Sequence, residues 1–240
     1  MVVDAVLFDY GDTLMRFAYE PELLEAGHRA GLDALGREGL PEPDAVAARF
    51  RERYEPLLWS ADAVDELEYP ALVRELLAEL GVEVDDEELA RFLEAEHAAW
   101  APARLLGAHT HALLESLRAR GLRLGIVSNA FDPGWLLRGD LDELGLASRV
   151  DHAVFSSEVG KRKPDPAIFH AALDALEVEP ERAVFVGDRV REDVAGAAAV
   201  GMRTVQAFWF RAEEGDAEPD FRAFTPHDVL NAVRRLNGES

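Results

Sequence analysis

Residues 6–14, Val-Leu-Phe-Asp-Tyr-Gly-Asp-Thr-Leu, decide the fold that we expect for this chain. A short apolar run stops at Asp9, and the turn-forming pair Gly11 and Asp12 follows at once. An apolar run bounded by turn residues is typical of a buried strand in a parallel sheet. Asp9 would then lie at the carboxyl end of this strand, which is where open α/β sheets bind ligands. Asp9 is therefore a candidate nucleophile or metal ligand, with a simple turn cap as the structural alternative.

The composition limits the classes of protein to which the chain can belong. With 240 residues, 48% of them hydrophobic, it can bury a full core or a core with a smaller appendage. Cysteine is absent, which excludes disulfides, thiolate nucleophiles and cysteine-ligated zinc. The first residues carry no export signal, and no apolar run reaches the ~20 residues that span a bilayer. We therefore expect a soluble, cytoplasmic protein with no membrane partner.

The charge of the chain is strongly negative. A net charge of −22 at pH 7 argues against a nucleic-acid partner, because the phosphate backbone would be repelled. Lys161 and Lys163 are the only lysines, and every other basic residue is Arg. This composition fits either adaptation to high salt or the codon usage of a GC-rich genome, and we favour codon usage. Two lysines in one loop still suggest that this loop has a task.

The pattern after the first expected strand is helical up to about residue 101. Apolar residues recur at helical spacing over 21–35, 43–59, 70–80 and 87–100. Four helices with no strand between them predict a small bundle inserted after the first strand. We therefore expect a helical cap domain at 16–101 and a discontinuous core formed by 1–15 and 102–240.

The pattern changes at Gly107, after which expected strands alternate with expected helices. The strands are expected at 122–127, 153–155, 183–186 and 204–208, and helices at 111–120, 134–144, 166–176 and 229–236. This alternation predicts a parallel, doubly wound α/β sheet, with the helical bundle as a smaller second domain.

Carboxylates follow two of the expected strands. Asp9 follows the first strand, and Asp188 follows the strand at 183–186, with Asp193 a few residues later. Asp9 fits the nucleophile of a phosphoryl transfer, and Asp188 and Asp193 fit a Mg²⁺ site, because Mg²⁺ prefers carboxylates and water. The ion would also relieve the repulsion between crowded carboxylates. The alternative for Asp188 and Asp193 is simple compensation of a helix N-terminus.

Donors and a fixed positive charge complete the requirements of phosphoryl transfer. Ser128 and Asn129 end the strand at 122–127, so this hydroxyl and the neighbouring amides are candidate phosphate-binding groups. Lys163 lies in the loop 160–166 and can place a cation beside the nucleophile. A solvated loop charge is the alternative for Lys163, whereas Lys161 is expected to be a surface charge.

With these residues assembled, the sequence resembles the haloacid dehalogenase (HAD) superfamily of hydrolases over the whole core. The resemblance rests on Phe-Asp-x-x-x-Thr-Leu at 8–14, Ile-Val-Ser-Asn at 126–129, Gly-x-x-Lys-Pro-Asp-Pro at 160–166, and Val-Gly-Asp-Arg-Val-Arg-Glu-Asp-Val-Ala-Gly-Ala at 186–197. It implies a Rossmann-like core, a movable cap at 16–101 and an aspartyl-enzyme intermediate on Asp9. It also implies that the backbone carbonyl of Gly11 joins Asp9 and Asp188 around Mg²⁺.

One position departs from the pattern of the phosphatases in this family. They carry a second Asp two residues after the nucleophile, as the general acid and base, but here that residue is Gly11 and an Asp follows as Asp12. Glycine transfers no proton. Asp12 could replace the acid in a slower phosphatase, the substrate could carry a good leaving group, or the chain could be a weak phosphate-binding relative. We list Asp12 with Asp9 and Lys163 as candidate catalytic residues.

The preferred interpretation is a Mg²⁺-dependent hydrolase that acts on a small phosphorylated metabolite. A dehalogenase or phosphonatase-like reaction is the alternative. The dehalogenase is the weaker of the two, because it has no need for a metal-binding pair such as Asp188 and Asp193. A regulatory module that binds phosphate without turnover is a further alternative. The sequence leaves the choice between monomer and homodimer open.

Aromatic residues are concentrated in the helical insertion and next to the first motif. We expect Tyr54, Trp59, His97 and Trp100 in the core of the bundle, and Tyr10 and Tyr19 at the mouth of the site.

Overall fold

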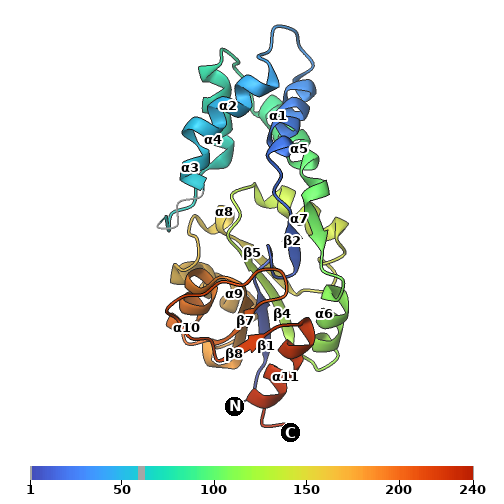
Figure 1. Cartoon of the computed structure of the whole chain (residues 1–240), viewed down its shortest axis with the longest axis vertical. Coiled ribbons are helices and arrows are strands. Elements are labelled where there is room, and N and C mark those ends of the chain that lie inside the picture. The colour runs from blue at the N-terminus through green and yellow to red at the C-terminus, as the bar shows by residue number, and fades with distance from the viewer. Residues whose placement is uncertain (1, 59–62, 240) are drawn as a thin grey trace.

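The computed structural model describes residues 2–58 and 63–239, and Figure 1 shows a sheet flanked by helices and a separate group of helices at one end. The six-stranded sheet has the order β5-β4-β1-β6-β7-β8, and every pair of neighbours is parallel. Its strands are β1 (Ala5–Phe8), β4 (Arg123–Ser128), β5 (His152–Phe155), β6 (Ala183–Gly187), β7 (Arg203–Ala207) and β8 (Phe221–Ala223). The predicted Rossmann-like α/β fold is confirmed, and β8 is a strand that the sequence pattern did not predict.

The register of the sheet explains why residues from distant segments meet. The central strand β1 lies between β4 and β6, with Phe8 opposite Ile126 on one side and Val186 on the other. Strand β1 is buried along its whole length, as its unbroken apolar run predicts. The residues that follow β1, β4 and β6 therefore emerge at the same edge of the sheet.

Helices cover both faces of the sheet, as in a doubly wound fold. One buried cluster packs Leu114 and Leu117 of α6 (Thr110–Arg118) and Val229 of α11 (Pro226–Leu236) against the sheet. A second cluster packs Phe169 and Leu173 of α9 (Pro166–Leu176) against the other face. Helix α7 (Gly134–Glu143) packs in the first of these clusters, and α8 (Ser156–Val159) and α10 (Gly196–Ala199) pack in the second.

The inserted helices have a hydrophobic cluster of their own. They are α1 (Pro21–Leu35), α2 (Pro43–Arg53), α3 (Glu55–Leu58), α4 (Tyr69–Glu79) and α5 (Asp86–Ala99). Phe92 packs so closely on α1 that a Cβ at Gly31 would lie 2.7 Å from its ring. The helix expected at 43–59 is broken between α2 and α3, and residue 59 lies outside the described residues.

We call the inserted helices α1 to α5 the helical layer. It joins the sheet through a short antiparallel pair, β2 (Met15–Phe17) and β3 (Arg104–Leu106). Figure 1 shows this pair between the helical layer and the sheet, with both termini at the far end of the molecule. The pair lies at both ends of the insertion, where the predicted domain boundaries fall. The division into a cap at 16–101 and a core stays a prediction.

A second link runs from the segment between α3 and α4 to the loop before α9. The amide of Arg162 donates to the Val64 carbonyl at 2.8 Å, and the amide of Glu66 donates to the Gly160 carbonyl at 3.1 Å. Lys161 forms an ion pair with Asp65 in the same segment. One of the two lysines thus ties the helical layer to this loop. Within the described residues, none of the helices has the length and apolar character that crossing a membrane requires.

Candidate active site at the strand tips

Three carboxylates meet at the carboxyl edge of the sheet. Asp9 directly follows β1, and its amide donates to the Val186 carbonyl of β6 at 2.8 Å. Asp188 directly follows β6, and Asp193 lies in the wide π-helical turn Val190–Ala195. Oxygen atoms of Asp9, Asp188 and Asp193 lie within 4.8 Å of one another. Asp9 is 7% exposed, and Asp188 and Asp193 are each 1% exposed, so water solvates these carboxylates poorly.

Lys163 places its ammonium group among these carboxylates. Its Nζ donates to Asp9 Oδ1 at 2.6 Å and to Asp193 Oδ1 at 2.7 Å, and the residue is only 3% exposed. A charge-assisted contact of this length orients the Asp9 carboxylate and compensates part of its charge. The structure therefore brings Lys163 to the nucleophile that the sequence suggested.

Asn129 holds the backbone of Lys163. Its Oδ1 accepts from the Lys163 amide at 2.6 Å, and its Nδ2 donates to the Lys163 carbonyl at 3.0 Å. Both polar groups of this side chain are thus engaged with the lysine. We predicted that Asn129 binds phosphate. Its side-chain contacts favour another role, which is to position Lys163. Ser128, at the end of β4, is buried and lines the cavity described below.

The charges at the strand tips are incompletely compensated. Burial raises the pKa of Asp9 to about 6, against the opposing effect of the Lys163 ammonium. Burial, together with the negative charges of Asp9 and Asp193, raises the pKa of Asp188 to about 9. Burial alone would lower the pKa of Lys163, but the carboxylates of Asp193 and Asp9 more than offset it, so this pKa lies above its usual range.

Asp188 also has an unsatisfied oxygen. Among the described residues, no hydrogen-bond donor reaches the buried Oδ2 of Asp188, and the nearest cation, Arg211 Nη1, is 3.7 Å away. A buried carboxylate oxygen without a partner is costly, because it loses its hydration and gains nothing in return. The three carboxylates, including this unpartnered oxygen of Asp188, form a donor set that suits a hard divalent cation.

Gly187 makes room for Asp193. A Cβ at Gly187 would lie 2.3 Å from Asp193 Oδ2, which accepts a hydrogen bond from the Arg189 amide at 2.9 Å. Any larger residue would displace this carboxylate from the Lys163 ammonium. The sequence shows a glycine before Asp188, and the close approach of Asp193 explains why no larger residue fits there.

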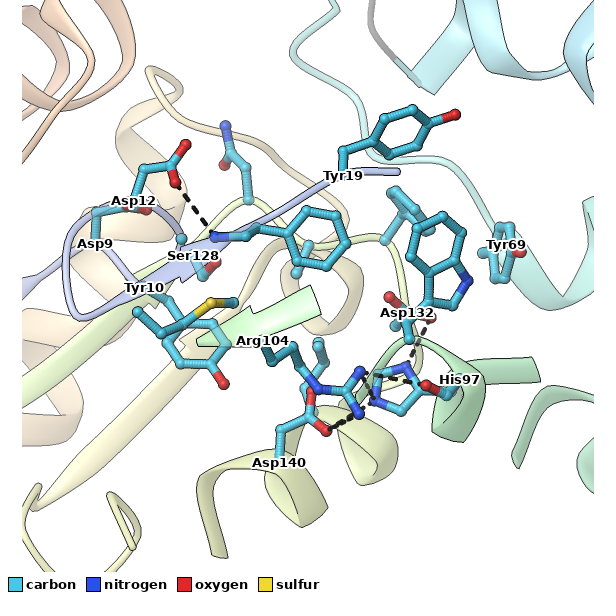
Figure 2. A pocket seen from close by; sticks show the side chains of 18 of the residues that line it. Asp9, Tyr10, Asp12, Tyr19, Tyr69, His97, Arg104, Ser128, Asp132 and Asp140 are labelled. Carbon is cyan, nitrogen blue, oxygen red and sulfur yellow. Dashed lines mark hydrogen bonds and ion pairs between the residues drawn. The ribbon is translucent and has the colours of Figure 1, made fainter. Parts of the chain in front are cut away.

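Asp12 and Gly11 lie in the turn that follows Asp9. Asp12 adopts a left-handed conformation with φ 58°, and its Oδ1 accepts a hydrogen bond from the Phe17 amide at 3.3 Å. Figure 2 shows this contact, with the Asp12 carboxylate beside Asp9 at one side of the cavity. A Cβ at Gly11 would meet no atom within 4 Å. The turn thus has space for a side chain at the position where the general acid is missing.

A cavity of about 440 Å³ extends from the strand tips to the helical layer. Figure 2 shows Asp9, Asp12 and Ser128 at one side of it, and Tyr69, His97 and Asp132 at the other. Tyr10 and Tyr19 line it, as expected for residues at the mouth of the site.

Two residues that we expected in the bundle core also line the cavity, and one of them, Trp100, packs against the hydrophobic cluster of the inserted helices as well. Trp100 and His97 contribute to the wall of the cavity, whereas Tyr54 is buried in the helical core as expected, and Trp59 lies outside the described residues. Both exceptions lie at or next to the C-terminal end of α5, where the chain turns back toward the sheet. The apolar periodicity of a helix does not reveal which of its ends faces a neighbouring domain.

His97 belongs to an ionic network that joins the helical layer to the core. Its Nε2 lies 3.0 Å from Asp140 Oδ1, and its Nδ1 lies 3.3 Å from Asp132 Oδ1. Arg104 Nη2 of β3 lies 3.0 Å from the same Asp140 oxygen. Burial opposes the charge of His97, but the hydrogen bonds and charges of Asp132 and Asp140 raise its pKa to about 9. We refer to His97, Asp132, Asp140 and Arg104 as the His97 network (Figure 2).

A parallel α/β sheet with buried acids and a lysine at its carboxyl edge is an arrangement found in α/β enzymes. The family model of the haloacid dehalogenase-like hydrolases matches residues 3–201. The chain therefore belongs to the haloacid dehalogenase-like hydrolase family, and the resemblance seen in its four motifs is confirmed.

Individual relatives cover the chain almost completely. It is 30% identical over 241 residues to the glyceraldehyde 3-phosphate phosphatase of Methanopyrus kandleri, covering 98% of this chain and 99% of the relative. A HAD phosphatase from Thermococcus onnurineus has a similar structure, with a TM-score of 0.66, 26% identity and 99% coverage of both chains. A 2-haloacid dehalogenase from Pseudomonas syringae is equally similar, with a TM-score of 0.68, 26% identity, and 98% and 99% coverage. The overall fold therefore does not distinguish phosphatase from dehalogenase.

Proposed function

We propose that this protein is a Mg²⁺-dependent phosphatase that hydrolyses a small phosphate monoester through an aspartyl-phosphate on Asp9. The observation that carries the proposal is the contact of the buried Asp9 carboxylate with the Lys163 ammonium at 2.6 Å, beside Asp188 and Asp193. The relatives named as phosphatases of glyceraldehyde 3-phosphate, phosphoserine and phosphoglycolate support the same class of substrate.

The residues at the strand tips fit a Mg²⁺ ion. The unpartnered Oδ2 of Asp188 and the excess of carboxylates over cations favour a divalent ion at this place. Asp9, Asp188 and the carbonyl of Gly11 would hold it, with Asp193 close by. When bound, the ion offsets the charge that gathers on the phosphoryl oxygens. Asp193 already accepts from Lys163 and from the Arg189 amide, so its contacts also support a role in orienting Lys163.

The reaction follows from the position of Asp9. A carboxylate oxygen of Asp9 attacks phosphorus, and the bond between phosphorus and the ester oxygen breaks as the alcohol leaves. Lys163 stays protonated, because its pKa lies above the usual range, and it holds the attacking carboxylate in a fixed orientation. Ser128 and the backbone amides after β1 and β4 donate to the phosphoryl oxygens. Water then attacks phosphorus, and the bond between phosphorus and the Asp9 oxygen breaks. The proton that the water loses balances the one that the alcohol gains, so inorganic phosphate is released and Asp9 is restored.

Proton transfer to the leaving alcohol is the weak point of this site. Asp12 lines the cavity, but its carboxylate is engaged with the Phe17 amide and must leave that contact to reach an ester oxygen. General acid catalysis contributes about 100- to 10,000-fold, so its loss slows turnover and leaves phosphoenzyme formation possible. We therefore place this enzyme among the slower phosphatases for esters of ordinary alcohols.

The dehalogenase alternative meets an obstacle in the cavity. A haloacid carries a carboxylate, which needs a cation near the reacting carbon. The cationic side chains that line the cavity lie beside acidic ones. Lys163 contacts Asp9 and Asp193, Arg104 contacts Asp140, Arg189 lies beside Glu192, and Arg162 lies beside Glu66. The buried acidic cluster is also a feature that halide displacement does not need, so phosphoryl transfer remains the better explanation.

The test is hydrolysis of para-nitrophenyl phosphate and acetyl phosphate with Mg²⁺ by the parent, Asp9→Asn and Asp142→Asn. Asp142 is exposed on α7 and serves as the matched control. We expect turnover in the parent and in Asp142→Asn, and none above background in Asp9→Asn. Acid quenching during turnover should trap a hydroxylamine-sensitive phosphoenzyme in the parent. Equal background rates in all three proteins would exclude the proposal and favour a module that only binds phosphate.

A further inference from the structure

The side of the cavity away from Asp9 is rich in aromatic rings. Phe17, Tyr19, Tyr69, Trp100 and Phe131 line it, and we call these five residues the aromatic pocket. Trp100 stacks with Phe17 at 5.8 Å and with Tyr19 at 5.7 Å between ring centroids, and Tyr69 contacts Phe131 at 4.9 Å. These contacts preorganise flat apolar surfaces, so a bound ring would need little side-chain ordering.

The size of the cavity exceeds the needs of a phosphate and a short chain. Its volume of about 440 Å³ falls in the range of pockets that enclose drug-sized molecules, roughly 300–1,000 Å³. A three-carbon phosphate would leave much of the aromatic pocket in contact with water. The space is therefore suited to an alcohol part that is larger and apolar.

The cationic residues that line the cavity already have acidic partners. In the described chain, Lys163 pairs with Asp9, and the arginine pairs are Arg104 with Asp140 at 3.0 Å, Arg189 with Glu192 at 3.6 Å and Arg162 with Glu66 at 3.8 Å. A carboxylate on the alcohol part of a substrate would compete with these acidic partners for the same cations. Burying it without a cation would cost its hydration.

The acidic groups near the aromatic pocket are compensated as well. Asp132 and Asp140 are neutralised by His97 and Arg104, and His97 is protonated because its pKa is about 9. Burial and the negative charge of Asp132 raise the pKa of Glu96 to about 8, and this residue accepts a hydrogen bond from the Tyr69 hydroxyl at 3.0 Å. The His97 network and Glu96 therefore add no excess negative charge to the pocket, and Glu55, the acidic residue beside Tyr19, accepts a hydrogen bond from the Tyr19 hydroxyl at 3.1 Å.

We infer that the substrate is a phosphate monoester of an uncharged, aromatic alcohol, with its ring in the aromatic pocket. The inference rests on the proposed phosphatase function and specifies its substrate class. The ester oxygen lies toward Asp9, the ring contacts Trp100 and Tyr19, and hydrolysis yields the neutral alcohol and inorganic phosphate.

The first experiment compares substrates that share one leaving-group core. The kcat/KM of the parent is measured with Mg²⁺ for para-methylbenzyl, para-carboxybenzyl and para-(aminomethyl)benzyl phosphate, and for glyceraldehyde 3-phosphate and phosphoglycolate. The para-methyl ester should exceed the para-carboxy ester by about 30-fold, because the carboxylate finds no free cation. Its kcat/KM should also exceed those of glyceraldehyde 3-phosphate and phosphoglycolate by about 10-fold, because these short substrates bury less apolar surface. A preference for the carboxylated or ammonium ester, or for either short-chain phosphate, would overturn the inference.

The second experiment locates the ring. Trp100→Leu and Tyr19→Leu should each lower the ratio of kcat/KM for para-methylbenzyl phosphate to that for methyl phosphate by about 10-fold. Trp135→Leu is the control, because Trp135 is 49% exposed and does not line the cavity; its ratio should match the parent. Circular dichroism and thermal melting of all variants verify folding. Unchanged ratios in both folded pocket variants would exclude the aromatic pocket as the binding site.

The two proposals fail in distinguishable ways. If the protein hydrolyses neither para-nitrophenyl phosphate nor acetyl phosphate, the phosphatase function is wrong. If it hydrolyses them and also prefers a short or anionic ester, the phosphatase function holds and the substrate class is wrong.

Discussion

The two ends of the active-site cavity contain similar residues, but they differ in how their charges are compensated. At the strand tips, Asp9 and Asp193 share the ammonium of Lys163, and a buried oxygen of Asp188 has no hydrogen-bond partner in the described chain. At the opposite end, Asp132 and Asp140 are matched by His97 and Arg104. We call the strand-tip end the unbalanced end, and under the proposed function a divalent cation would supply the positive charge that it lacks. We call the end at His97 the balanced end, because its acidic and basic side chains are paired with one another. In the proposed complex, the aromatic rings beside it contact the substrate.

Removing a carboxylate from the unbalanced end should have the largest effect. Asp188→Asn should lower phosphatase turnover by about 1,000-fold and weaken Mg²⁺ binding, because the proposed site loses a charged ligand. In the parent, Mg²⁺ at ~100 times its Kd should stabilise the fold by about 2.7 kcal/mol, measured by thermal unfolding with and without the ion. That stabilisation should disappear in Asp188→Asn and persist in Asp142→Asn. An unchanged Mg²⁺ effect in Asp188→Asn would place the ion elsewhere.

Removing the cation from the same end should have the next largest effect. Lys163→Met should lower kcat by about 100-fold, because the Asp9 carboxylate loses its partner at 2.6 Å. The pKa of Asp9, about 6 in the parent, should rise further. The acidic limb of the pH–rate profile should then move to higher pH.

The matched control for this variant is the other lysine. Lys161 pairs with the exposed Asp65, so Lys161→Met should leave kcat and the pH–rate profile close to those of the parent. A loss of activity in Lys161→Met equal to that in Lys163→Met would show that the loop, and not the ammonium at Asp9, is what matters.

Adding an acid at Gly11 should produce a smaller effect of opposite sign. Gly11→Asp should raise kcat for alkyl phosphates by about 10-fold, because the position is sterically open and a proton donor is restored. The gain should be much smaller for para-nitrophenyl phosphate, whose leaving group needs no proton. Asp12→Asn separates the alternatives: a further loss of alkyl-ester turnover assigns proton transfer to Asp12, and no change removes Asp12 from the mechanism.

A substitution at the balanced end should alter the pH dependence of the free energy of unfolding more than it alters catalysis. The pKa of His97 is raised from 6.5 to about 9, so the folded state holds its proton more tightly than the unfolded chain does. The stabilisation is therefore complete below pH 6.5 and is lost as the pH rises through 9. It should amount to about 1 to 3 kcal/mol, because one pKa unit corresponds to 1.36 kcal/mol.

The measurement is denaturant unfolding between pH 6.5 and 9 at saturating Mg²⁺, so that the strand-tip carboxylates keep a constant state. The groups facing His97 are Asp132, Asp140 of α7 and Arg104 of β3, with Glu96 as its chain neighbour. His97→Gln should flatten the decline in stability, whereas the exposed His152→Gln should follow the parent. Parallel curves for the parent and His97→Gln would contradict the assigned role of the network.

The strand-tip residues were predictable because their signal is local. An apolar run that ends in Asp9, or in Gly187 and Asp188, indicates both a strand and the point where it stops, and a parallel sheet brings such points to one edge. Lys163 was predictable for a similar reason, since its loop precedes a helix with a clear N-cap at Asp165. Local pattern and simple topology together were sufficient for these residues.

The partners of the other residues depended on contacts between segments distant in the chain. Asn129 holds the backbone of Lys163, 34 residues away, and His97 meets Asp140 across 43 residues. Neither contact leaves a periodic trace in the sequence. For the same reason, the sequence indicated the contact of Trp100 with the bundle core but not that this residue also lines the cavity.

The amino-acid sequence by itself thus determined the parallel sheet, its helical insertion and the acidic strand tips, because hydrophobic periodicity and turn residues act over a few positions. The tertiary structure alone decided which charges are paired and which oxygen is left without a donor. It also decided which rings face the cavity. These outcomes depend on how the helical layer and the sheet pack against each other, and that packing is a property of surfaces assembled from many separate segments.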